Sequence, residues 1–288
     1  MKESPRSRRP TSGSPWTFFG LVFGLSVPFW VAGGLVPVSD DVPLQLPASA
    51  LMFVCPAIAA TVLLRRERGR GPARQLLRST VSVASVEQER WYLPALLLMP
   101  LVMLASYGLM SLAGTPFPPP DASLYLVPVQ FVVFFLAAAA EEAGWTGYAT
   151  RGLQTHRSAL TTALIVGTVW ACWHVLPYVQ GGHSAGWIVW QCVATVALRV
   201  LIVWLHNNAD HSVFIAAVFH AMINVSNAGF PTNGSQYDPA VTGPLLVLLA
   251  VIVALGWGRS TLAEPRYRLR SRPPAARSGR DGDAPSTQ

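Results

Sequence analysis

The chain of 288 residues is 51% hydrophobic and only 12% charged, and its mean hydropathy is +0.38. A soluble globular domain carries about 25% charged residues, so this composition argues against a soluble protein and favours a membrane protein. The net charge of +7 is concentrated in the two tails and one internal loop, each beside an apolar segment, which argues against a nucleic-acid-binding surface.

Eight apolar segments approach the roughly 20 residues that a helix needs to cross a bilayer. The first is too long for the apolar part of a typical signal peptide and lacks a small-residue cleavage site, so we expect it to be retained. We therefore predict an all-α, polytopic membrane bundle of about eight transmembrane helices, within a membrane domain that covers residues 16–258. The predicted spans are 16–36, 46–64, 91–113, 122–150, 159–177, 186–205, 212–228 and 244–258.

Arginines mark one side of this bundle. Residues 65–78 read as an internal loop with six arginines, and the N-terminal tail, the connection after the fourth span and the C-terminal tail are also basic. The intervening loops (37–45, 114–121, 178–185 and 229–243) contain no Lys or Arg. Because cationic loops stay in the cytoplasm, we expect both termini there. The tails 1–15 and 259–288 are rich in Pro, Ser and Arg, which predicts disorder.

Few ionisable groups lie within the predicted spans, and such groups usually face a cavity or a partner. Two adjacent carboxylates, Glu141 and Glu142, follow an apolar run in the fourth span. Three further spans contribute His174, Arg199 and His220, and Asn224 lies one helical turn after His220 on the same face. Carboxylates, imidazoles and an amide on separate helices at similar depth are a catalytic or metal-binding inventory.

Three segments carry a family resemblance. They read "EEAGWTGYATRGLQ" from Glu141, "WACWHVLPY" from Trp170 and "FHAMIN" from Phe219. Their order and spacing resemble those of the CPBP (Abi) family of CAAX-processing and bacteriocin-processing intramembrane endopeptidases. In that family EExxxR is followed by an aromatic residue four positions before a His, and then by H-x-x-x-[ND]. The resemblance covers residues 122–228.

One position departs from the family pattern. The arginine of EExxxR is replaced by Thr146, which raises the alternative that the site has lost activity. Arg151 is five residues further along and points about 140° away on an ideal helix, so it is not an obvious substitute. Arg199 either reaches the cytoplasmic interface or pairs with a carboxylate, and a role in replacing the motif arginine is a third alternative.

The resemblance implies hydrolysis of a peptide bond at or within the membrane. A carboxylate shielded from water is a stronger base, so Glu141 with His174 can deprotonate a water molecule. His220 and Asn224 can donate to the developing oxyanion. Glu142 points about 100° away from Glu141 and is expected to hold the site together. Trp145 and Trp170 are expected to pack or line the site.

Three alternatives stay open at this stage. Glu141, His174 and His220 offer a His₂Glu set for Zn²⁺, although the prediction that we favour uses no cofactor. A catalytically silent relative that acts as a binding or immunity scaffold is favoured by Thr146. A small transporter with a proton relay is compatible with buried acids and histidines, but the sequence lacks the internal repeat that such folds often show.

Two further motifs are expected to be structural. "GHSAG" at 182–186 fits G-x-S-x-G, but that nucleophile motif requires a strand before it and a helix after it in an α/β sheet. Here the motif lies in a turn between two spans. "HNNADH" at 206–211 is read as a helix break with Asp210 near the next N-cap.

Partners and location follow from the same reasoning. The expected partners are the lipid bilayer and a peptide or protein substrate, with no nucleic acid. A nearly Lys-free sequence rich in Ala, Arg, Pro and Gly is typical of a GC-rich bacterial genome, which predicts a multi-pass protein of a bacterial plasma membrane. In that setting a peptide, leader sequence or membrane protein is a better expected substrate than a prenylated one.

Overall fold

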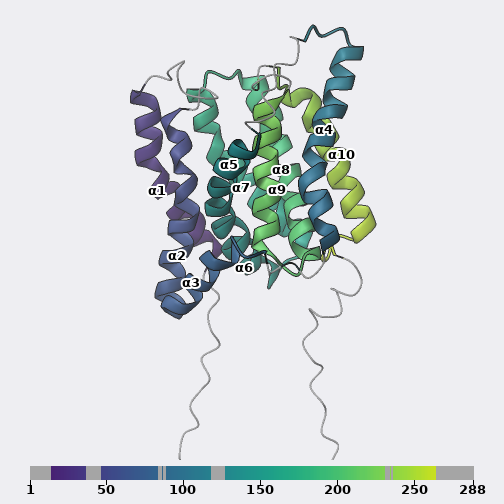
Figure 1. Ribbon diagram of the computed structural model, residues 1–288. Coiled ribbons are helices and arrows are strands. Elements are labelled where there is room, and N and C mark those ends of the chain that lie inside the picture. Colours follow the sequence, from purple (N-terminus) through teal and green to yellow (C-terminus); the bar gives the residue numbers. More distant parts are fainter. Residues whose placement is uncertain are drawn as a thin grey trace, which may run out of the picture.

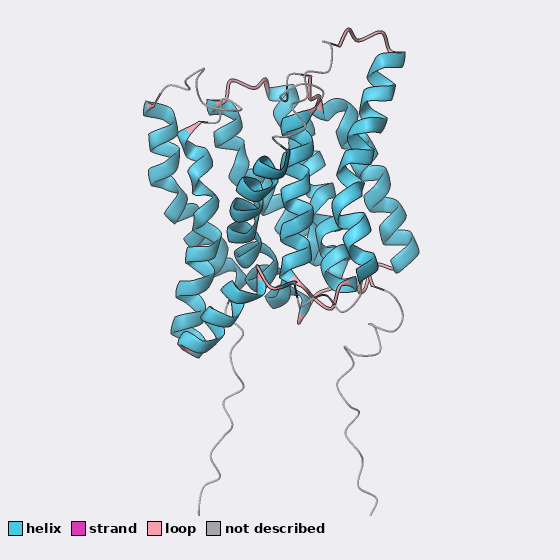
Figure 2. Ribbon diagram, viewed as in Figure 1, coloured by secondary structure: helices cyan, strands magenta, loops and turns pink. Residues whose placement is uncertain are grey.

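The computed structural model describes residues 14–36, 47–83, 86, 89–117, 127–230, 234 and 236–263. Within these residues every regular element is a helix and no strand is present, as Figures 1 and 2 show. The prediction of an all-α membrane bundle is confirmed, and the chain is a multi-pass membrane protein. The two predicted disordered tails lie almost entirely outside the described residues.

Most of the long helices lie side by side and roughly parallel to one axis (Figure 1). Two 3₁₀ segments, η2 (Ala48–Val54) and η4 (Glu89–Trp91), lead directly into helices, and a π-helical segment, η6 (Trp145–Thr150), extends α5. The helices are α1 (Pro15–Leu35), α2 (Cys55–Arg68), α3 (Arg70–Ser79), α4 (Tyr92–Leu112), α5 (Val127–Gly144), α6 (Arg151–Gln154), α7 (Ala159–Gln180), α8 (Ala185–Asn208), α9 (Val213–Gly229) and α10 (Pro239–Trp257).

In the described part of the chain, seven helical stretches are long and apolar enough to cross a bilayer. They correspond to seven of the eight predicted spans. The remaining predicted span, 212–228, forms α9, which is apolar but only 17 residues long and is buried in the centre of the bundle between its neighbours. Contact with other helices instead of lipid explains how a shorter helix is accommodated.

The helices of the second half begin with side-chain caps. Each capping oxygen accepts a hydrogen bond from an N–H of the first turn, which satisfies a donor that has no partner within the helix. The "GHSAG" motif is therefore a helix start, as expected, and not a nucleophile turn. In "HNNADH", Asp210 and His211 break the helix with φ of 54° and 56°, and Asp210 lies two residues before the N-cap Ser212, as expected. The caps are Ser158, Ser184, Ser212 and Asp238.

The prediction that residues 65–78 form a loop is wrong. The first part continues α2 to Arg68, and the remainder forms α3 after a sharp turn at Gly69, whose φ of 86° suits glycine. Ala73 and Leu76 bury one face of α3 while its arginines stay exposed. This segregation makes α3 an amphipathic helix of the kind that lies at a membrane interface.

Contacts near both ends of the described chain show that the bundle begins and ends on the same side. Pro15, at the start of α1, lies next to Gly152 of α6. Beyond α10, the carbonyl of Ser260 accepts a hydrogen bond of 2.8 Å from the N–H of Ala159, the first residue of α7. This arrangement fits an even number of crossings, and the cytoplasmic location of that side stays a prediction.

Candidate active site

The two carboxylates lie in the last turn of α5, where the helix changes its winding. Residues Trp145–Thr150 are π-helical, and the hydroxyl of Thr150 donates to the carbonyl of Trp145 at 2.8 Å. The predicted fourth span thus forms, but not as one uniform α-helix. Short π-helical insertions occur frequently at functional sites. Their local change in winding re-aims the side chains on either side.

Glu141 points toward α7. Its Oε2 accepts a hydrogen bond of 2.9 Å from the indole Nε1 of Trp170, and the residue as a whole is 7% exposed. A hydrogen bond to a carboxylate is stronger than one between neutral groups, so this contact fixes the orientation of the acid. Among the described residues, the second oxygen of Glu141 makes no hydrogen bond, so it is available to bind water.

Glu142 points toward α8 and α9 and is completely buried. Its Oε1 accepts from Nδ1 of His220 at 2.9 Å, and its Oε2 accepts from Nη1 of Arg199 at 2.8 Å. The hydroxyl of Thr146, one turn further along, donates to the same Oε2. One carboxylate therefore links three helices, which favours the supporting role expected for it.

Trp170 lies at the centre of the cluster, although the sequence suggested only packing or lining. Its ring centroid lies 5.5 Å from that of His174 and 5.1 Å from that of His220. The guanidinium carbon of Arg199 lies 4.2 Å from the same ring, a cation–π contact. With its N–H on Glu141, Trp170 contacts four of the polar side chains that the sequence singled out.

The two imidazoles have different environments. In His174, which is half-buried, Nδ1 donates to the carbonyl of Trp170 at 2.8 Å, so in the neutral ring Nε2 is a free acceptor. His220 is only 3% exposed, and its Nδ1 is bound to Glu142. Asn224 lies one turn after His220 on α9 and is half-buried. Thus His174 and Asn224 are the more accessible members of the site.

The flanking motif residues are explained by packing. Trp145 is fully buried and makes edge-to-face contacts with Phe18 and Trp173, with ring centroids 5.5 Å apart in both pairs. A Cβ on Gly144 would lie 2.6 Å from the carbonyl oxygen of Pro56, so α5 crosses α2 too closely for a side chain there. Trp145 thus packs around the site, and among the described residues it makes no hydrogen bond or ring contact with the polar side chains of the cluster.

Arginine placement resolves the alternatives that the sequence left open. Arg151 donates to the carbonyl of His211 at 2.7 Å, in the connection between α8 and α9, and not to either carboxylate. The pKa of His211 is lowered, mainly by burial and secondly by the positive charge of Arg151, so its imidazole is neutral at pH 7. Arg199 does not reach the interface: it is fully buried against Glu142. The sequence did carry a sign of this ion pair: Arg199 lies at the centre of a span, where a charged side chain needs a partner.

A zinc site was the alternative for the same residues. In the described part of the chain, no three side chains of His, Cys, Asp or Glu lie close enough together to hold a metal ion. In this arrangement Glu141, His174 and His220 do not form the converging donor set that zinc needs. The metal-free alternative stays a prediction.

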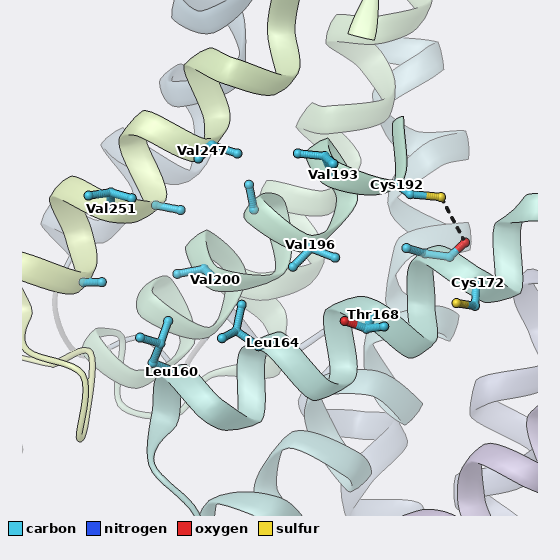
Figure 3. Close-up of a pocket in the computed structure, with 14 residues that line it drawn as sticks. Leu160, Leu164, Thr168, Cys172, Cys192, Val193, Val196, Val200, Val247 and Val251 are labelled. Carbon is cyan, nitrogen blue, oxygen red and sulfur yellow. Dashed lines mark hydrogen bonds between the residues drawn. The ribbon is translucent and has the colours of Figure 1, made fainter. Parts of the chain in front are cut away.

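Two cavities of the bundle lie away from these residues. One, of about 530 Å³, lies between α7, α8 and α10 and is lined by apolar side chains together with Thr168, Cys172 and Cys192 (Figure 3). The other, of about 400 Å³, lies between α4, the start of α5 and α9. Neither is lined by a carboxylate or an imidazole, so neither is the candidate site.

Comparison with known proteins agrees with the sequence motifs. Residues 123–226 match the family model described as type II CAAX prenyl endopeptidase Rce1-like. CAAX prenyl protease 2 of Methanococcus maripaludis is 22% identical over 263 residues, which cover 83% of this chain and 93% of that protein. The matched segment contains all three motifs and every polar residue of the cluster. The resemblance is confirmed: over residues 123–226 this multi-pass membrane protein is similar to the Rce1-like CAAX prenyl endopeptidases.

Proposed function

We propose that this protein is an intramembrane endopeptidase that hydrolyses a peptide bond of a membrane-associated peptide or protein. The observation that carries the proposal is the convergence of Glu141, His174 and His220, from three separate helices, on Trp170. Glu142 joins this cluster through its hydrogen bond with His220. Such a set of acids and imidazoles, shielded from bulk water, is suited to general acid–base catalysis. The family match adds independent support.

Glu141 and His174 are the pair that activates water. Trp170 holds one oxygen of Glu141, and the carbonyl of Trp170 holds Nδ1 of His174. The remaining carboxylate oxygen and Nε2 of His174 are both acceptors, so the two groups can bind the two protons of one water molecule. As the water oxygen attacks the carbonyl carbon, its proton passes to this pair and then to the leaving amine when the C–N bond breaks.

His220 and Asn224 are the proposed oxyanion donors. Because Nδ1 of His220 already donates to Glu142, Nε2 can donate only when the imidazole carries both protons. The side-chain amide of Asn224 lies one turn away on the same face of α9 and supplies a second, neutral donor. Glu142 thus acts through His220 and does not attack the substrate.

Prenylated and unprenylated peptides are both candidate substrates. The matched family and the archaeal relative are both named for CAAX prenyl substrates. The sequence itself favours an unprenylated peptide, leader or membrane protein. An assay must therefore offer both kinds.

The decisive experiment is a cleavage assay in detergent with quenched peptides, half of them farnesylated. We expect the parent to cleave at least one group. Glu141→Gln should lower kcat on the order of 10²–10⁴-fold through loss of the base, and His220→Ala about 10²–10³-fold through loss of an oxyanion donor. His156→Ala, an exposed histidine in the connection before α7, is the matched control and should retain full activity.

Each alternative makes a different prediction in this assay. Activity that survives both site substitutions would place the chemistry elsewhere. An inactive parent across all peptides would favour the silent scaffold that Thr146 suggests. Loss of activity with a chelator and recovery with zinc would favour the zinc-dependent alternative.

A further inference from the structure

The buried arginine of α8 is the feature that the motifs do not account for. Arg199 and Glu142 both have side chains with no exposed surface, and Nη1 of Arg199 lies 2.8 Å from Oε2 of Glu142. A charge removed from water and lipid headgroups is destabilising unless it is paired and hydrogen-bonded. Its position in the middle of a membrane-spanning helix therefore points to a specific task.

Arg199 lies against the very residue that departs from the family pattern. Nη1 also donates to the hydroxyl of Thr146 at 3.3 Å, and that hydroxyl donates in turn to Glu142. Position 146 is where the EExxxR motif carries its arginine. A positive charge is thus present beside this position, but it comes from a different helix, 53 residues further along the chain.

A close helix crossing brings this charge into the site. A Cβ added to Gly167 of α7 would lie 3.0 Å from Cβ of Arg199 and 3.1 Å from Cα of Val196, so the α7 and α8 backbones approach closely at this level. The arginine stem enters at the crossing, and its guanidinium lies 4.2 Å from the ring of Trp170. Trp170 in turn binds Glu141. The guanidinium of Arg199 therefore contacts Glu142 directly and Glu141 through the ring of Trp170.

We infer that Arg199 is a positioning residue that replaces the motif arginine. It fixes Glu142, and through Glu142 the orientation of His220; through the ring of Trp170 it also fixes Glu141. Thr146 is then the small, hydrogen-bonding counterpart of a relocated arginine and not the mark of a decayed enzyme. The inference rests on the proposed function for its kinetic consequences, but its structural consequence can be measured without activity.

The test exchanges the two positions in the full-length protein. The variants are Arg199→Ala, Thr146→Arg and the double substitution, each compared with the parent for kcat, KM and thermal unfolding in detergent. Arg199→Ala should lower kcat about 10²-fold with little change in KM, because small misplacements of catalytic groups have effects of that size. Thr146→Arg alone should also lower kcat, since it adds a second buried guanidinium beside Glu142. The double variant should recover at least tenfold over Arg199→Ala.

Several results would overturn the inference. A rise in kcat above the parent in Thr146→Arg would mean that the site had lost its arginine without replacement. A double variant that regains thermal stability but no activity would reduce Arg199 to a purely structural ion pair. If Arg199→Ala does not fold, Arg199→Lys takes its place, because it keeps the charge without the forked geometry. This variant should show a measurably lower kcat and no measurable loss of stability.

A second readout separates this inference from the proposed function. In ¹⁵N-histidine-labelled protein, the His220 resonance, assigned with His220→Gln, should show a proton on Nδ1 because Glu142 is held beside it. Arg199→Ala should shift that resonance, and the double substitution should restore it. An unchanged His220 signal in Arg199→Ala would contradict the positioning role even if the parent cleaved no peptide, whereas the predicted shift in an inactive parent would contradict only the endopeptidase.

Discussion

At the scale of single residues, the adjacent carboxylates of α5 have different environments, and the different tasks proposed for them follow from this difference. Glu141 has one hydrogen bond and some exposed surface, whereas Glu142 is buried between a guanidinium and an imidazole. The ideal 100° step between neighbouring helical residues directs one acid to α7 and the other to α8 and α9. Sequence adjacency therefore says little about shared function here.

This difference predicts opposite outcomes for two conservative substitutions. Glu142→Gln leaves the charge of Arg199 buried without a counterion, so we expect the free energy of unfolding to fall by about 3–5 kcal/mol. Glu141→Gln retains an amide oxygen that accepts from Trp170, so stability should change by about 1 kcal/mol or less. Denaturant unfolding in detergent measures both. Equal losses of stability would contradict the separation of roles.

At the scale of helices, the first glycine of the first motif, Gly144, is explained by how closely α5 and α2 cross. A Cβ on Gly144 would lie 2.5 Å from Cβ of Pro56. The proline ring is rigid and fixed to the α2 backbone, so it cannot turn aside as a flexible side chain would. We expect Gly144→Ala to destabilise the protein by about 1–3 kcal/mol through overpacking and to lower activity by displacing both acids.

The chain offers a matched control for this substitution. A Cβ on Gly24 of α1 would meet nothing within 4 Å, so Gly24→Ala should leave stability unchanged or raise it by up to about 1 kcal/mol. Thermal unfolding of both variants under the same conditions decides the matter. A tolerated Gly144→Ala would mean that the close crossing is not needed to position the carboxylates.

The helices themselves were largely predictable, and the exceptions have physical reasons. Length and apolar content identify a span because a bilayer sets both, so all eight predicted segments contain a helix. Residues 65–78 were assigned to a loop because their charge outweighs a short apolar face that only packing reveals. The π-helical turn after Gly144 has no local sequence signal, because it depends on how the neighbouring helices hold the chain.

At the scale of the whole molecule, the site was predictable as a list of residues but not as an arrangement. Three motifs identified the acids and imidazoles because their spacing is local. The pairing of Arg199 with Glu142 joins residues 57 positions apart, and nothing in either segment specifies it. The central place of Trp170 likewise follows from the packing of α7 against its neighbours. Long-range contacts of this kind come from the topology of the bundle.

The last prediction concerns how the bundle lies in the membrane. Eight crossings with cytoplasmic termini place the end of α4 outside and the connection before α7 inside. The test starts from a protein whose native cysteines are replaced by alanine. A single cysteine at the exposed position Ala113 then shows on which side α4 ends, and one at the exposed position His156 shows on which side the connection before α7 lies. A membrane-impermeant maleimide should label Ala113→Cys in intact cells, but His156→Cys only after permeabilisation. Labelling of both from outside would remove one crossing, and the reversed pattern would put the arginine-rich side, and with it α3, outside the cell.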